Sequence, residues 1–301
     1  MALEFFKIEQ HKNLEERLRT DNISSELLES LWIDNNFSWL PLDHYRKGNS
    51  SVTISPERWA SIPSLILDGK EIFYNDPERR NNPSQNIREG FRMWPQAGNF
   101  NEKDMRDLGY NLKQHWFLRD VKREKQSLTT NGTISYLLKS TLETLQKFPH
   151  HFNILQMIEL GDEDVNISLY VQNKGEHWLS FAPGHHTYYK VDPSQKKNIE
   201  LDDNMQVTNE MKNKRINGEE TIVVPNPGRS KMRIPGTGEI ETYYDPKFKD
   251  IRLRSEKDKW FVCKEPVVDE AKNRLQSAII IKQWEIMNVW ISIKLLSKDN
   301  R

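Results

Sequence analysis

The chain has 301 residues, 36% of them hydrophobic, and its 44 lysine and arginine residues equal its 44 aspartate and glutamate residues. A chain without net charge creates no long-range field for nucleic acid or an anionic membrane, so neither is expected as a partner. The single cysteine, Cys263, excludes an intramolecular disulfide and a CxxC metal site. No apolar run approaches membrane-spanning length and no signal peptide is evident, so a cytoplasmic location is expected.

The first 45 residues differ from the rest of the chain. Residues 14–31 are charged and carry leucines at near-helical spacing, and residues 24–29 (Ser-Ser-Glu-Leu-Leu-Glu) could begin a second helical turn. The pattern predicts a short helical N-terminal extension over residues 1–45, followed by one main domain over residues 46–301.

From about Ser50 onward, short apolar runs alternate with turn residues, which is typical of strands. Two runs alternate cleanly and predict strands with one buried face; their apolar positions are Val165, Ile167, Leu169 and Val171, and then Val289, Ile291 and Ile293. Residues 137–145 fit either a helix or a strand, although the apolar positions from Ile134 to Leu138 favour a strand at the start. Many short strands predict an all-β sandwich.

Three segments carry side chains suited to proton transfer: residues 114–120, 180–189 and 260–266. His115 lies between polar and aromatic neighbours and taken alone is more often structural. The adjacent His185 and His186 would point to opposite faces of a strand, so they supply at most one metal ligand, and no metal site is expected. Glu265 follows an apolar run, where a carboxylate is paired or used unless it faces the surface at the strand end.

Taken together, the segments resemble the galactose mutarotase-like family of aldose 1-epimerases and hexose-6-phosphate 1-epimerases. The similar stretches occur in the family's order and are residues 88–98 (Arg-Glu-Gly-Phe-Arg-Met-Trp-Pro-Gln-Ala-Gly), 114–120 (Gln-His-Trp-Phe-Leu-Arg-Asp), 148–152 (Phe-Pro-His-His-Phe), 171–173 (Val-Gln-Asn), 184–191 (Gly-His-His-Thr-Tyr-Tyr-Lys-Val) and 261–266 (Phe-Val-Cys-Lys-Glu-Pro). The resemblance covers roughly residues 50–295. It implies a large twisted antiparallel β-sandwich that acts on a small-molecule sugar.

The resemblance also implies roles for individual residues. Glu265 would be the base for the C1 hydroxyl and His186 the acid for the ring oxygen, while His115 would hold the sugar in line. His186 is preferred to His185 because it lies two residues after Gly184. Arg88 matches a position that contacts the sugar or its phosphate, and Gln96 is a candidate for a contact to a sugar hydroxyl, with a structural role in the turn as the alternative. The reaction opens and closes the sugar ring by acid–base chemistry, so no cofactor and no metal are expected.

Two departures from the family pattern affect the substrate. Trp116 stands where the family has a glycine, and residues 221–229 contain no acid where the family commonly has a sugar-binding aspartate. Either Asn226 takes its place, an acid elsewhere does, or sugar recognition has changed. Because the resemblance extends over most of the chain, an aldose 1-epimerase is the leading hypothesis. The alternatives are a hexose-6-phosphate 1-epimerase, whose phosphate would need a cationic cluster such as Arg88, Arg92 and Arg119, and a non-catalytic carbohydrate-binding protein on the same fold.

Overall fold

The computed structural model describes residues 43–55, 60–75, 90–93, 117–122, 132–208, 211, 221–268 and 278–296. Tertiary contacts divide the chain into two units, Met1–Leu40 and Pro41–Arg301, and all of the described residues belong to the second. The proposed helical extension over residues 1–45 falls almost entirely outside them and stays a prediction. The first described strand begins at Asp43.

The largest sheet has eight antiparallel strands in the order β12-β14-β15-β19-β9-β8-β7-β6. In that order, the strands are Glu200–Leu201, Arg229–Ile234, Gly238–Tyr244, Ile286–Leu296, Asp164–Asn173, Phe152–Leu160, Gly132–Lys139 and Phe117–Lys122.

In the described part of the chain, three smaller sheets accompany it. The five-stranded sheet has the order β13-β16-β17-β11-β5, with strands Ile222–Pro225, Asp250–Ser255, Phe261–Val267, Gly184–Lys190 and Phe91–Met93. The four-stranded sheet has the order β1-β2-β3-β4, with strands Asp43–Lys47, Ser50–Ser55, Ser61–Leu67 and Lys70–Glu71. The last sheet pairs β10 (Leu179–Phe181) with β18 (Ile279–Ile281).

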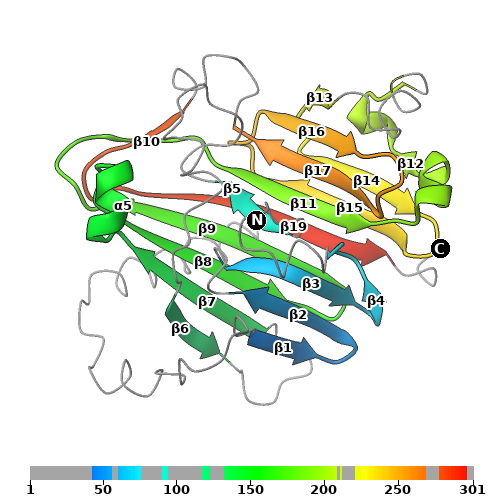
Figure 1. Ribbon diagram of the computed structural model, residues 1–301, viewed down its shortest axis with the longest axis horizontal. Coiled ribbons are helices and arrows are strands. Elements are labelled where there is room, and N and C mark those ends of the chain that lie inside the picture. The colour runs from blue at the N-terminus through cyan, green and yellow to red at the C-terminus, as the bar shows by residue number, and fades with distance from the viewer. Residues whose placement is uncertain are drawn as a thin grey trace, which may run out of the picture. The chain divides into compact units, whose positions relative to one another are not determined.

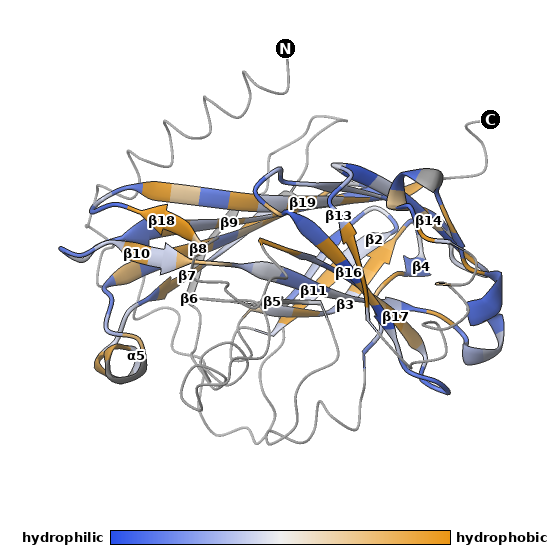
Figure 2. Cartoon of the chain, turned by 90° about the horizontal axis from the view of Figure 1, so that it is seen from above, coloured by the Kyte–Doolittle hydropathy of each residue, from blue (hydrophilic) through white to orange (hydrophobic). Residues whose placement is uncertain are grey.

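The five-stranded and eight-stranded sheets form the two layers of a sandwich (Figures 1 and 2). Polar contacts between described residues also cross between the layers: Lys264 on β17 donates to Ser230 on β14 at 3.0 Å, and the hydroxyls of Tyr189 on β11 and Thr242 on β15 lie 3.3 Å apart. One cluster of buried apolar side chains includes residues from both layers and from the four-stranded sheet. The predicted all-β antiparallel sandwich is therefore confirmed.

The two segments with the cleanest alternation are neighbouring strands of the eight-stranded sheet. β9 and β19 pair so that Val289 lies opposite Leu169, and Ile293 lies opposite Val165. The predicted apolar positions are all buried. Because side chains alternate between the two faces of a strand, this register places both apolar faces on the same side of the sheet, against the core.

The ambiguous segment divides into a strand and a helix. The predicted strand start is confirmed, since β7 runs to Lys139, and the helix α5 (Leu142–Lys147) follows it. Thr141 caps this helix: its hydroxyl accepts from the Thr144 amide at 3.2 Å, and the Thr144 hydroxyl accepts from the Thr141 amide at 2.7 Å. This reciprocal box satisfies two amides that the first turn would leave without partners. In the described part of the chain, no helix combines the length and the apolar character needed to cross a membrane.

Candidate functional site

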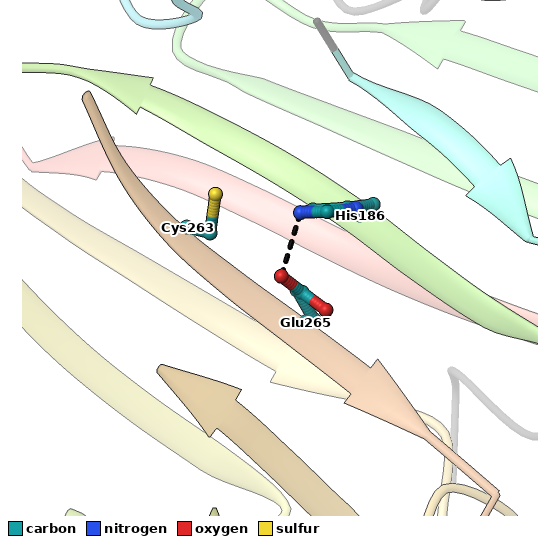
Figure 3. Close-up of side chains that lie close together, drawn as sticks. All are labelled: His186, Cys263 and Glu265. Carbon is teal, nitrogen blue, oxygen red and sulfur yellow. Dashed lines mark ion pairs between the residues drawn. The ribbon is translucent and has the colours of Figure 1, made fainter. Parts of the chain in front are cut away.

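Two strands of the five-stranded sheet bring His186 and Glu265 together. β11 pairs with β17 so that Gly184 lies opposite Val267 and Thr187 lies opposite Lys264, a register that sets His186 opposite Glu265. The Nε2 atom of His186 and the Oε1 atom of Glu265 are 2.6 Å apart, and their side chains are only 9% and 7% exposed. Figure 3 shows this contact between the neighbouring strands.

The two adjacent histidines lie on opposite faces of β11, as the sequence predicted. His185 faces the same way as Thr187, since its Nδ1 atom lies 2.7 Å from the Thr187 hydroxyl oxygen. His186 faces the other way, where its ring stacks on that of Tyr188 with centroids 4.4 Å apart and planes 19° apart. The stacking restricts the orientation of the imidazole beside Glu265.

The electrostatic surroundings favour the ionised form of Glu265. Burial would raise the pKa of this carboxyl, but the charge and hydrogen bond of His186, together with the charges of Arg252 and Arg254, outweigh it. The pKa therefore lies below its ordinary value. Arg252 is directly opposite Glu265 in the pairing of β16 with β17, and Arg254 is opposite Cys263.

Neither arginine was among the site residues predicted from the sequence. The pattern Arg252-Leu-Arg254 places both guanidinium groups on one face of a strand, which is the signal that could have indicated them. Only the strand pairing shows that this face is the one that carries Glu265.

A second row of side chains borders the pair. Tyr188 lies opposite Cys263 in the sheet and packs edge-on against Phe261, with ring centroids 5.0 Å apart. Cys263 is a buried thiol that forms no disulfide. Its sulfur, an imidazole nitrogen of His186 and a carboxylate oxygen of Glu265 all lie within 4.8 Å of one another, so these three residues offer a set of metal ligands.

Asn226 has a structural role. Its side-chain amide donates to the backbone carbonyls of Asp245 and Phe248, at 3.2 and 2.8 Å, and its oxygen accepts from the Gly228 amide at 2.8 Å. With its polar atoms bound to backbone groups of two turns, Asn226 does not take the place of a sugar-binding aspartate.

The remaining predicted site residues are His115, Arg88 and Gln96, and all three lie outside the described residues. Of the other two arginines considered for a phosphate, Arg92 is in β5, opposite His185 in the register, and Arg119 is in β6 of the eight-stranded sheet. The described part of the site is therefore built on β11, β16 and β17.

Comparison with known proteins identifies the family. The sequence model of the aldose 1-epimerase family matches residues 94–277, which is more than half of the chain and includes both His186 and Glu265. The chain belongs to the aldose 1-epimerase family. Membership supports an epimerase or mutarotase as the general class of protein.

Solved structures share the fold of this aldose 1-epimerase family member at low sequence identity. A protein from Synechocystis sp. PCC 6803 is 16% identical with a TM-score of 0.67, and the match covers 88% of this chain and 100% of that one. A galactose mutarotase related enzyme from Lactobacillus acidophilus is 14% identical with a TM-score of 0.64, covering 87% and 99%. A galactose mutarotase-like protein from Clostridium acetobutylicum is 12% identical with a TM-score of 0.65, covering 86% and 100%. No curated protein matches the sequence.

Proposed function

We propose that the protein is an aldose 1-epimerase that interconverts the α and β anomers of a hexose by opening and closing its ring. The observation that carries the proposal is the buried contact of 2.6 Å between His186 Nε2 and Glu265 Oε1, in a chain of the aldose 1-epimerase family. A carboxylate beside an imidazole supplies a base and an acid that exchange protons with a substrate near neutral pH.

The proton transfers balance over one turnover. The Glu265 carboxylate takes the proton from the C1 hydroxyl while the His186 imidazolium gives a proton to the ring oxygen, and the bond between C1 and the ring oxygen breaks. Rotation about the bond between C1 and C2 then turns the other face of the aldehyde toward the freed hydroxyl. On closure, His186 takes the hydroxyl proton back and Glu265 returns its proton to the C1 oxygen, so both groups recover their starting states.

The closeness of the two side chains suits this chemistry. The C1 hydroxyl oxygen and the ring oxygen are bonded to the same carbon, so the base and the acid that serve them must also lie close together. A sugar entering the site would replace the direct contact between His186 and Glu265 with one hydrogen bond to each. The lowered pKa of Glu265 keeps that carboxyl ready to accept a proton at neutral pH.

The sugar itself would be held by residues assigned through the family resemblance. His115 would hydrogen-bond the ring oxygen or a neighbouring hydroxyl, and Arg88 and Gln96 would contact other hydroxyls. Arg is well suited to such contacts because its guanidinium group donates two parallel hydrogen bonds.

A hexose 6-phosphate is a second candidate substrate, favoured by the arginines of β16. Arg252 and Arg254 place two guanidinium groups on the face that carries Glu265, and the Arg254 side chain is 54% exposed. Guanidinium groups bind phosphate strongly, so a sugar phosphate is the anionic hexose that this face would accept best.

The test measures the rate of mutarotation of freshly dissolved α-glucose, α-galactose and glucose 6-phosphate, with polarimetry or NMR as the detection method. Wild-type protein should accelerate at least one of them, and Glu265→Gln should lose that acceleration by about 100-fold or more, since a positioned acid or base contributes 10²–10⁴-fold. Glu239→Gln is the matched control, because Glu239 pairs with Arg233 on the eight-stranded sheet and should leave the rate unchanged.

Each result decides between the hypotheses. The sugar with the highest kcat/KM identifies whether the substrate is phosphorylated. If the folded wild-type protein binds these sugars but accelerates the mutarotation of none of them, the enzyme hypothesis would be rejected in favour of a non-catalytic carbohydrate-binding protein. Equal activity of wild type and Glu265→Gln would remove Glu265 from the mechanism.

A further inference from the structure

Cys263 lies beside the proposed catalytic pair, and the proposed reaction does not use it. It lies two residues before Glu265 on β17, and both are buried. Alternation along a strand puts the two side chains on the same face. Figure 3 shows the thiol and the carboxylate side by side on β17, with His186 approaching from β11.

These three side chains have the chemistry of a zinc site. Thiolate sulfur, imidazole nitrogen and carboxylate oxygen are the three ligand types that Zn²⁺ takes in proteins. The three ligand atoms lie within 4.8 Å of one another, and two of them, on His186 and Glu265, are 2.6 Å apart. Ligand atoms around a tetrahedral Zn²⁺ are about 3.3–3.8 Å apart, given bonds of about 2.0–2.3 Å.

We propose that His186, Cys263 and Glu265 form an inhibitory binding site for Zn²⁺ and related transition-metal ions. To coordinate the ion, the His186–Glu265 contact must widen by about 1 Å and the sulfur must approach by about 1 Å, given the ligand spacing of a tetrahedral site. Rotations about side-chain bonds supply movements of this size, so the strand pairing need not change. Binding converts the thiol to a thiolate and releases its proton to solvent.

The charges around the site both attract and repel the metal ion. The thiolate and the carboxylate together neutralise the two positive charges of the ion, while Arg252, opposite Glu265 in the sheet, repels it. Replacing Arg252 by methionine should therefore tighten metal binding.

A bound ion would stop the proposed reaction. It would occupy the Nε2 atom of His186 and the carboxylate of Glu265, the two groups that must exchange protons with the sugar. The inhibition rests on the proposed function, whereas the binding itself does not.

Binding is tested by titrating the metal-free protein with Co²⁺ in the absence of oxygen. One equivalent should produce the visible bands of tetrahedral Co²⁺ and a thiolate-to-cobalt charge-transfer band. Added Zn²⁺ should displace the Co²⁺ and abolish these bands. Because Cys263 is the only cysteine in the chain, a charge-transfer band can come from no other residue. Cys263→Ala and Cys263→Ser should lose the band, and two substitutions guard against one that fails to fold.

Inhibition is tested by measuring mutarotation against Zn²⁺ concentration, with a chelator to reverse it. Cys263→Ala should turn over like wild type without metal and need at least about tenfold more Zn²⁺ for half-inhibition, since even the loss of a residue that only orients a ligand weakens metal sites 10–100-fold. Absence of the charge-transfer band in folded wild type, or equal Zn²⁺ sensitivity in Cys263→Ala, would overturn the site. A charge-transfer band in a protein without mutarotase activity would support the metal site and refute the proposed function.

Discussion

Lys264 is a lysine enclosed between the two layers of the sandwich, and it gives the sharpest prediction on stability. Lys264 is only 1% exposed. Its amine lies 3.0 Å from the Ser230 hydroxyl, and 5.5 and 5.7 Å from the ring centroids of Tyr189 and Tyr244, respectively. Burial lowers the pKa of this amine from 10.5 to about 7, and the charge of Asp202 only partly opposes the fall. The folded protein therefore disfavours the charged form that the unfolded chain carries.

The cost follows from the two pKa values. A fall from 10.5 to about 7 corresponds to about 5 kcal/mol at about 1.36 kcal/mol per tenfold change in proton affinity. At pH 7 the folded amine is half protonated, which reduces the cost to about 4 kcal/mol. Lys264→Met removes the charge and also one hydrogen bond of about 1 kcal/mol. The substitution should therefore raise the free energy of unfolding by about 3 kcal/mol at pH 7.

The dependence on pH has a definite sign. Between pH 7 and 10.5 the unfolded chain binds a proton at Lys264 that the folded protein does not, so this residue makes stability rise with pH in that window. Below pH 7 the cost is constant and at its largest. The advantage of Lys264→Met over wild type should therefore shrink steadily above pH 7. It should reach zero before pH 10.5, where the remaining cost of the buried charge equals the hydrogen bond of about 1 kcal/mol that the substitution removes.

The assay is urea unfolding followed by tryptophan fluorescence, at several pH values from 7 to 10. Lys231→Met is the control, because the Lys231 amine lies on the partly exposed side of β14 at 3.2 Å from Glu239, and its loss should change stability by less than about 1 kcal/mol. Ser230 keeps a partner in Lys264→Met, since its hydroxyl lies 2.7 Å from that of Tyr244. If Lys264→Met were no more stable than wild type at pH 7, the desolvation cost assigned to this lysine would be refuted.

Three further substitutions test the packing around the site. In Gly90→Ala the new Cβ would lie 2.5 Å from a ring atom of Phe73, so thermal unfolding should show a free energy of unfolding lower by about 2 kcal/mol. Adding Phe73→Leu should recover part of this loss. If the effects of the two substitutions on stability simply added, the clash would be contradicted. Asn226→Ala breaks three hydrogen bonds to backbone groups and should cost about 2 kcal/mol without changing KM, whereas a raised KM would return Asn226 to the sugar site. Tyr188→Leu removes the ring stacked on His186 and should lower kcat about fivefold, as expected for the loss of about 1 kcal/mol of aromatic contact; Tyr188→Phe should keep the wild-type rate, and an equal loss in both would implicate the hydroxyl instead.

The sequence alone determined the strands that have one face in the core and one face away from it. Val165 to Val171 and Val289 to Ile293 alternate at a period of two, and this local signal is set by the pleat of each strand. The order of the motif segments also identified the family, because it depends only on the residues and their spacing. His186 was preferred to His185 on the same basis, and the structure places His186 beside Glu265.

Only the tertiary structure decided which side chains meet. The contact between His186 and Glu265 and the position of Arg252 depend on the pairing of β11, β17 and β16, and register between strands far apart in sequence leaves no local pattern. The burial of Lys264 was equally hidden. Every residue of β17 from Phe261 to Val267 is buried, so both faces of this strand are covered. Alternation identifies the inner face of a strand only when the other face meets water, and for that physical reason the sequence could not place this lysine between the sheets.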